Sequence, residues 1–170
     1  YGAPTVDTDV TTSLDYDPDD NYAVTKADSE QIIVTSGLDY CVLRISGVAI
    51  PVFQEPPAAW PFLPDQKIEF IHRDDAVFAI TSAVTAKLTA ENRIINVSGG
   101  LTWRMKGSQY VADYFEMIDV DPAEAIYQST AGHFAWYSDE GGNDTLKYQN
   151  NSYPTYLAQL QGDIDHLMAE

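Results

Sequence analysis

The chain has 170 residues, of which 45% are hydrophobic and 12% aromatic; this is enough for one globular domain and too apolar for a disordered protein. Nine Lys and Arg residues stand against 26 Asp and Glu residues, and the net charge of −17 excludes nucleic acid and anionic membrane surfaces as expected partners. Because no apolar run is long enough for a membrane helix and the first residues lack a secretory pattern, we expect a cytoplasmic protein.

The first predicted elements are a loop and a helix. Residues 3–21 are rich in Asp, Thr and Pro without an apolar period, which predicts a loop. Residues 21–36 are predicted to form a helix, because Asp19 and Asp20 offer N-cap oxygens before it and Gly37 offers a C-terminal stop after it.

A near-continuous apolar run follows at residues 39–50. Such a run is typical of a strand buried on both faces of a parallel sheet, and a helix followed by this strand makes half of a β-α-β unit. The single cysteine, Cys41, lies in the run and is predicted to be a buried thiol. Residues 51–64 contain five prolines among several aromatic residues, which predicts an irregular loop, either packed on the surface or lining a binding cleft.

The rest of the chain predicts two strands and three helices. The strands lie at residues 67–72 and 93–98, and the helices are predicted to begin at caps formed by Asp74, Ser108 and Ser152. Each helix carries an apolar stripe that we expect to face the core. The stripes are Val77, Ile80, Val84 and Leu88; Val111, Phe115 and Ile118; and Leu157, Leu160, Ile164 and Leu167.

Tyr22 and Lys26 are the first candidate site residues. They stand one turn apart in the predicted helix, so the phenol and the ammonium emerge as neighbours on one face. The ammonium stabilises a phenolate over a phenol, which would make Tyr22 a proton-transfer group. The same spacing also arises by chance on a solvated helix face, so the pair alone leaves both interpretations open.

Further segments follow this pair in a characteristic order. Tyr1-Gly2 precedes Tyr22-x-x-x-Lys26, and the later segments are residues 36–44 (SGLDYCVLR), 71–77 (IHRDDAV), 93–100 (RIINVSGG) and 139–148. Over nearly the whole chain, this order resembles the extended short-chain dehydrogenase/reductases, the NAD(P)-dependent epimerase/dehydratase family. In that family the tyrosine is the catalytic acid/base beside the nicotinamide, and the lysine binds the nicotinamide ribose. The resemblance therefore implies catalytic and cofactor-binding roles for Tyr22 and Lys26, with NAD or NADP as the cofactor.

The resemblance also implies an α/β fold with two parts in one compact unit. Residues 1–51 would be the C-terminal part of a Rossmann-like parallel-sheet domain, including the catalytic helix. Residues 52–170 would form mainly a small α/β substrate-binding region. Within that region, Lys67 and Arg104 are the predicted substrate-binding residues.

Several parts of the family pattern are missing. No Gly-rich dinucleotide turn occurs, and the family's catalytic Ser or Thr would precede Tyr1. Sugar-nucleotide members commonly carry Asn where this chain has Gly47, which leaves a nucleotide-sugar substrate in doubt. We therefore expect the C-terminal portion of such a protein, lacking the N-terminal nucleotide-binding half and inactive as an isolated chain. Its expected partner is that missing half or another copy of the chain.

Three hypotheses about function stay open at this point. The first is the C-terminal portion of an oxidoreductase that acts on a small hydroxyl- or carbonyl-bearing substrate, of the sugar type or another. The second is a non-catalytic binding or self-assembling module derived from a reductase fold, and the third is a regulator that binds the cofactor without turnover. A metal site is not predicted, because His72, His133 and His166 lack ligand spacing.

Overall fold

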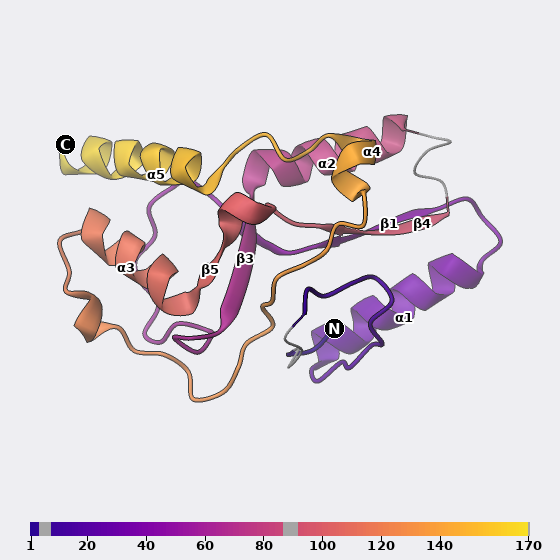
Figure 1. Cartoon of the computed structure of the whole chain (residues 1–170), viewed down its shortest axis with the longest axis horizontal. Coiled ribbons are helices and arrows are strands. Elements are labelled where there is room, and N and C mark those ends of the chain that lie inside the picture. Colours follow the sequence, from indigo (N-terminus) through magenta and orange to yellow (C-terminus); the bar gives the residue numbers. More distant parts are fainter. Residues whose placement is uncertain (4–7, 87–91, 170) are drawn as a thin grey trace.

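The computed structural model describes residues 1–3, 8–86 and 92–169, and Figure 1 shows the whole chain. The helices are α1 (Asn21–Thr35), α2 (Arg73–Thr85), α3 (Gly107–Met117), α4 (Gly142–Leu146) and α5 (Tyr153–Met168). The strands are β1 (Cys41–Ile45), β2 (Gly47–Ala49), β3 (Lys67–His72), β4 (Arg93–Val97) and β5 (Arg104–Lys106).

The strands form two small sheets. β1 pairs with β4 in parallel, while β3 pairs with β2 in parallel and with β5 antiparallel. In Figure 1, α1 lies on one side of the β1–β4 pair and α2 lies on the other, whereas α3 and α5 lie beside the second sheet. The chain is therefore an α/β protein, as the sequence predicts.

The predicted strand at residues 39–50 is divided in the structure. β1 ends at Ile45, and from Gly47 the chain leaves β4 and pairs with Phe70 of β3. Glycine permits this change of sheet, because a Cβ at position 47 would lie 2.8 Å from Cδ1 of Phe70 and 3.2 Å from a ring carbon of Phe134. The expectation of burial on both faces is also wrong, since β1 is half-buried and Ile45 is exposed. Among the described strands, β1 pairs only with β4, so its second edge is open.

Two clusters of buried residues form the core. One lies between the second sheet and α3 and α5, and it includes Phe62, Trp103 and Leu160. The other packs between the β1–β4 pair and α2, and it includes Ile95 and Tyr148. The apolar stripes predicted for α3 and α5 contribute their central residues to the first cluster, while Leu167 at the end of α5 is exposed.

The stripe predicted for α2 does not face the core. Val77, Ile80 and Val84 are exposed, and Leu88 lies outside the described residues. α2 instead turns Ala76 and Ala79 toward the β1–β4 pair. Small side chains let the helix approach the sheet closely, and the larger β-branched residues are left on its outer side.

Helix caps follow the sequence in two of four places. The Asp20 side chain accepts a hydrogen bond from the Ala23 N–H at 2.6 Å, and Ser152 caps α5. The predicted Asp74 cap is replaced by His72, whose Nδ1 accepts from the Asp74 N–H at 3.1 Å. The predicted Ser108 cap is also wrong: α3 begins one residue earlier, at Gly107, without a side-chain cap, and the Ser108 N–H donates to the Pro64 carbonyl.

The proline-rich segment and the predicted division of the chain can now be placed. Residues 51–64 form no helix or strand apart from a single bridge between Trp60 and Tyr127, as predicted. The β1–β4 pair joins residues from both sides of position 51, and a division into residues 1–51 and 52–170 stays a prediction. Cys41, which was predicted to be buried, is only half-buried, because β1 is half-buried as a whole. Among the described helices, none is both long and apolar enough to cross a membrane.

Candidate active site

A groove of about 530 Å³ separates α1 from β1. Tyr22, Lys26 and Glu30, which are spaced one turn apart on α1, line one wall, and Arg44 of β1 lines the other. The N-terminal segment and the chain around Tyr137 close part of the rim. The structure therefore brings the Tyr-x-x-x-Lys pair into the largest of the described cavities.

The position of Tyr22 and Lys26 follows from how α1 begins. The Asp20 cap starts the helix at Asn21, which places Tyr22 in its first turn. Lys26 Nζ lies 5.4 Å from the centre of the Tyr22 ring, and both side chains are exposed, Tyr22 by 70%. The ammonium therefore lies over the face of the phenol ring, in the geometry of a cation–π contact.

Arg44 and Glu30 form an ion pair in the groove. The carboxylate of Glu30 accepts hydrogen bonds from Arg44 Nη2 at 2.7 Å and Nε at 3.0 Å, and from the Tyr16 hydroxyl at 2.8 Å. Burial opposes ionisation of Glu30, but the Arg44 and Tyr16 hydrogen bonds outweigh it and hold the pKa of Glu30 below its usual range. The pair therefore ties α1 to β1 through a charged contact.

Tyr1 connects the Glu30–Arg44 ion pair to β4, the second strand of the β1–β4 pair. Its hydroxyl donates to Asn96 Oδ1 of β4 at 2.7 Å and accepts from Arg44, whose guanidinium lies 4.6 Å from the Tyr1 ring centre. Burial raises the pKa of Tyr1, so its hydroxyl stays protonated at neutral pH. The residues that hold the groove together thus come from α1, β1, β4 and the start of the chain.

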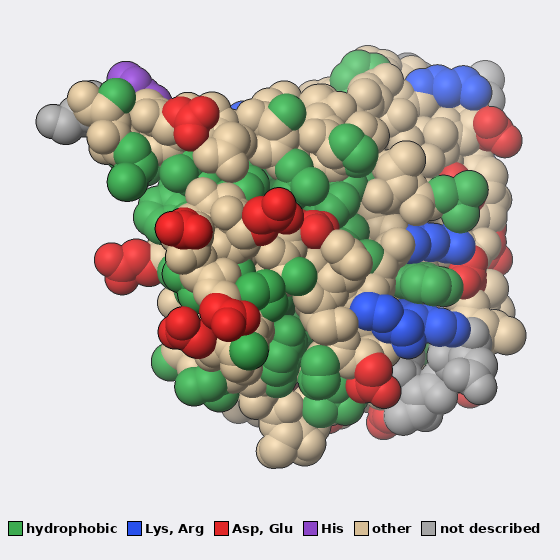
Figure 2. All heavy atoms as spheres, turned by 60° about the vertical axis from the view of Figure 1, so that its left-hand side comes forward, with side chains coloured by type: hydrophobic (Ala, Val, Ile, Leu, Met, Phe, Trp, Pro, Cys, Tyr) green, Lys and Arg blue, Asp and Glu red, His purple; other side chains and the backbone are tan. Residues whose placement is uncertain are grey.

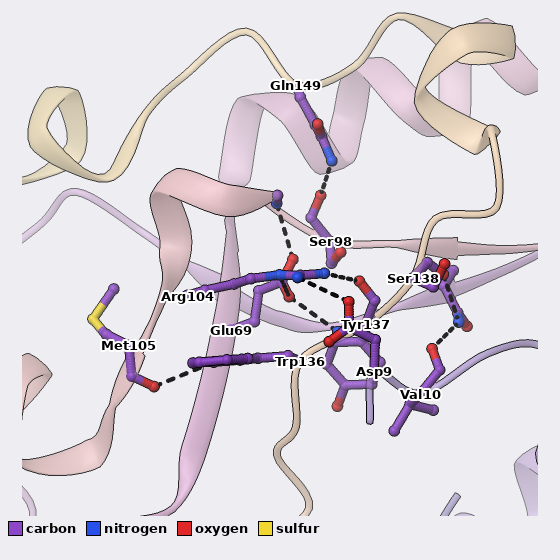
Figure 3. A network of polar contacts seen from close by, with 12 residues as sticks. Asp9, Val10, Glu69, Ser98, Arg104, Met105, Trp136, Tyr137, Ser138 and Gln149 are labelled. Atoms are coloured by element: carbon purple, nitrogen blue, oxygen red, sulfur yellow. Dashed lines mark hydrogen bonds and ion pairs between the residues drawn. The ribbon is translucent and has the colours of Figure 1, made fainter. Parts of the chain in front are cut away.

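Arg104 is held by three acceptors in a second network, drawn in Figure 3. Its guanidinium contacts Glu69 Oε2 at 3.1 Å, Asp9 Oδ2 at 2.8 Å and the Tyr137 carbonyl at 2.5 Å. It also lies 5.9 Å from the ring centre of Trp136. These contacts fasten the N-terminal segment and the chain at Tyr137 to β3 and β5.

Glu69 is the buried centre of this network. It has no exposed surface, and its carboxylate also accepts from the backbone N–H groups of Gly100 at 2.9 Å and Tyr137 at 3.0 Å. Burial raises the pKa of Glu69, against the effect of these hydrogen bonds and of Arg104. Tyr137, whose backbone is fixed here, also forms part of the rim of the groove.

The four predicted site residues are placed in two groups. Tyr22 and Lys26 lie together in the groove, while Lys67 and Arg104 both lie against Trp136, with Lys67 Nζ 5.0 Å from its ring centre. Tyr137, beside Trp136, connects the two groups. Substrate binding by Lys67 and Arg104 stays a prediction.

Sequence reasoning missed the Glu30–Arg44 pair. Two signals point to it: Glu30 continues the Tyr22–Lys26 spacing by one more turn, and Arg44 is a charge within an apolar strand, where an ionic partner is expected. Sequence reasoning also does not bring His133 together with Asp19 and Asp20, whose ligand atoms lie within 4.8 Å of one another at the surface. His133 Nε2 lies 2.9 Å from Asp19 Oδ1 and the Asp20 side chain caps α1, which accounts for this cluster.

The proline-rich loop lines a second cavity, of about 200 Å³. Its other walls come from β2, β3, α3 and α5, and it does not share a lining residue with the groove. Phe70 faces this cavity, and its ring centre lies 5.4 Å from that of Phe134, the neighbour of groove residue His133.

No protein-family model and no curated protein matches the sequence. Solved structures do match the fold. A dTDP-glucose 4,6-dehydratase from Bacillus anthracis in complex with NAD aligns with a TM-score of 0.76 and 14% identity, over 97% of this chain and 58% of its own. A UDP-glucuronic acid 4-epimerase from Bacillus cereus in complex with UDP-glucuronic acid and NAD aligns with a TM-score of 0.74 and 15% identity, over 98% of this chain and 59% of its own. A dTDP-glucose 4,6-dehydratase from Streptomyces venezuelae with NAD bound aligns with a TM-score of 0.75 and 18% identity, over 99% of this chain and 57% of its own.

The chain has the Rossmann-like fold of these NAD-dependent sugar epimerases and dehydratases. It spans less than two thirds of the length of each of the three matched structures. The likeness in fold agrees with the resemblance seen in the sequence motifs, and it extends over nearly all of the chain.

Proposed function

We propose that the chain is the C-terminal portion of an NAD(P)-dependent, epimerase/dehydratase-like oxidoreductase that acts on a small hydroxyl- or carbonyl-bearing substrate in the cytoplasm. The observation that carries the proposal is the placement of Tyr22 and Lys26 together in the α1–β1 groove of this fold. Sugar-type substrates are one option, in keeping with the substrates named for the matched structures.

Tyr22 is the proposed acid/base. As a phenolate, Tyr22 would take a proton from a substrate hydroxyl at its phenolic oxygen atom, and as the resulting phenol it would return that proton to a carbonyl oxygen. Lys26 would hold the negative charge that Tyr22 develops, and the first-turn N–H groups of α1 would add to this stabilisation. The Glu30–Arg44 pair would position both residues by fixing α1 on β1.

The described residues fit one end of the cofactor. The groove is open and lined by Tyr22 and Lys26, which would face the nicotinamide and its ribose. NAD(P), when bound, supplies the hydride chemistry. A Gly-rich phosphate cradle does not occur in the sequence, so the rest of the cofactor site is assigned to another half of the protein.

The apolar surface around β1 supports a further half. The second edge of β1 is open, Ile32 and Ile33 on α1 are exposed, and so are Val77 and Val84 on α2, on the other side of the pair. A strand pairing with β1 and helices covering α1 and α2 would bury all of them. We therefore assign this surface to the proposed nucleotide-binding half.

The test is to measure the intact mass and the activity of the naturally produced protein and to compare the mass with the reading frame that encodes it. We expect a product with a Gly-rich turn upstream of Tyr1 that binds NAD(P) and transfers hydride, whereas residues 1–170 alone bind it at least tenfold more weakly. Equal cofactor binding by residues 1–170 alone would overturn the division of the site between two halves.

The second candidate is a self-assembling module without catalysis. The same exposed apolar surface favours it, since another copy of the chain would also cover Ile32 and Val84. This candidate would be supported by two results together. The start codon of the reading frame would directly precede Tyr1, and the protein would form an oligomer that does not bind NAD(H) or NADP(H).

A further inference from the structure

The cavity beside the proline-rich loop, which we call the aromatic pocket, is built mainly from rings. Five aromatic residues line it: Trp60, Phe70, Tyr110, Tyr114 and Tyr156. The Phe70 and Tyr110 ring centres are 4.9 Å apart, and Trp60 meets Tyr110 and Tyr114 edge-on at 5.9 and 5.7 Å. The rings therefore pack against one another and form a continuous aromatic lining.

The lining of the pocket carries one charge. Glu55 is the only acidic residue among those that line it, and no Lys or Arg is part of the lining. Burial raises the pKa of both Tyr110 and Tyr156, so these hydroxyls stay uncharged. Figure 2 shows a similar distribution on one face: acidic and hydrophobic side chains mix on the left-hand side of the view, where α5 ends, and the Lys and Arg side chains visible there lie mainly on the right-hand side.

The mouth of the pocket is apolar and exposed. Val48, Ile50 and Val52 alternate along the chain, all line the pocket, and all are exposed, whereas Ala49 between the first two is buried. Three neighbouring aliphatic side chains therefore surround the mouth, where they would contact an apolar ligand that enters the pocket.

The walls of the pocket are fixed by hydrogen bonds. The Tyr114 hydroxyl donates to the Gln54 carbonyl, and Asp163 of α5 accepts from the Phe53 N–H at 2.8 Å. These contacts hold the proline-rich loop against α3 and α5. The pocket is therefore already formed in the protein without a ligand.

Its size suits one ring. A cavity of about 150 Å³ in another protein binds benzene, and the aromatic pocket measures about 200 Å³. A nucleoside diphosphate is larger than this space, and its phosphates would meet Glu55 without a cation to pair with.

We propose that the aromatic pocket is a binding site for an uncharged or cationic compound with a single apolar ring, and that it rejects nucleoside diphosphates. The site goes beyond the proposed oxidoreductase function, because it shares no lining residue with the groove that holds Tyr22 and Lys26. It would give the protein a second ligand of a defined chemical class.

Two-dimensional NMR titration of the protein tests this directly. The chain has three Trp residues, so three indole N–H signals report on three places: Trp60 in the pocket, Trp103 in the core and Trp136 beside Arg104. The probes are benzyl alcohol, benzylamine, benzoate and UDP, titrated in the absence of NAD(H). We expect benzyl alcohol and benzylamine to shift the Trp60 signal, with benzoate roughly tenfold weaker because of Glu55, and UDP to leave it unchanged.

Matched variants distinguish binding in the aromatic pocket from non-specific binding to exposed apolar side chains. Val48→Trp places a large ring at the mouth, and Val77→Trp places the same ring on α2, at similarly exposed positions (45% and 54%). We expect Val48→Trp to weaken benzyl alcohol binding at least tenfold and Val77→Trp to leave it unchanged. Val52→Trp serves as a second blocking variant if Val48→Trp does not fold.

The charge of Glu55 provides the last comparison. Glu55→Gln should remove the preference for benzylamine over benzoate while benzyl alcohol binds as in the wild type. The proposal is overturned if Trp60 does not respond to benzyl alcohol, if benzoate or UDP binds as tightly, or if both blocking variants bind normally. None of these results depends on NAD(P) binding, so a failure here is distinct from a failure of the proposed oxidoreductase function.

Discussion

The Glu30 carboxylate of α1 and the Arg44 guanidinium of β1 face each other through two hydrogen bonds, at 2.7 and 3.0 Å. Glu30 is the only buried residue of α1. The helix that carries Tyr22 and Lys26 is therefore held to the sheet by a polar contact, while many of its apolar side chains face outward.

Replacing Glu30 with Gln should lower the free energy of unfolding by about 1–3 kcal/mol, since Arg44 loses its charged partner in a buried place. The pKa of Glu30 is held below its usual value of 4.5, so its stabilising effect is complete above that pH and is lost as the pH falls through the lower value in the folded state. Urea unfolding at pH 7 and pH 3 measures both effects.

A matched control for this change is Glu116→Gln, because Glu116 is exposed on α3. It should leave stability within about 0.5 kcal/mol of the wild type. If the difference between Glu30→Gln and the wild type is as large at pH 3 as at pH 7, the ion pair is not its cause.

Arg104→Met should destabilise the protein by about 3–5 kcal/mol, because it leaves the buried Glu69 carboxylate without its cation. The carbonyl of Tyr137 also loses a donor, which should loosen the rim of the groove. Thermal and urea unfolding measure the loss. The exposed Arg73 provides the control variant Arg73→Met, and equal stability of the two variants would contradict the structural role of Arg104.

Many of the helices and strands could be predicted from the local sequence, because short-range signals such as caps and turn glycines determine where they begin and end. The strand predicted at residues 67–72 has the bounds of β3, and Gly37 adopts a left-handed φ of 77° after α1, where a side chain would be strained. The break after Ile45 was not predictable, since it depends on Phe70 and Phe134, which are distant in sequence and come to lie against Gly47. The spacing of hydrophobic residues also does not predict that α2 packs on the sheet through its alanine side chains.

The candidate site shows the same division between local and tertiary information. The helical period by itself is sufficient to place Tyr22 and Lys26 on one face. The partner of Arg44 is fixed only when α1 folds back onto β1, and the aromatic pocket is formed by segments from four parts of the chain. Such sites need the tertiary fold to be recognised.

The isolated chain should self-associate through the apolar surface around β1. Ile32 on α1 and Val84 on α2 are exposed by 69% and 76%, so the double variant Ile32→Asp/Val84→Asp should shift the protein to a monomer at concentrations where the wild type forms oligomers. Sedimentation velocity measures this. Leu101→Asp, at an equally exposed residue outside α1 and α2, should keep the oligomer. A monomeric wild type at all concentrations would contradict the prediction.

Lys26→Met tests the second residue of the pair. In the complete protein, the change removes the ammonium that lies 5.4 Å from the Tyr22 ring centre, so we expect weaker NAD(P) binding and a lower rate together. Cofactor titration and steady-state kinetics measure the two effects. Stability should not change, because Lys26 is exposed. Unchanged cofactor affinity would remove Lys26 from the cofactor site.

Tyr22→Phe is the sharpest test of the proposed chemistry. It removes one oxygen atom from a side chain that is 70% exposed, so the fold and NAD(P) binding should be unchanged. Loss of a general acid/base should lower the rate of the complete protein by about 10²–10⁴-fold. Tyr40→Phe, at a tyrosine outside the groove, should keep full activity. If Tyr22→Phe keeps it as well, proton transfer belongs to another residue, and Tyr22 is then only part of the wall of the groove.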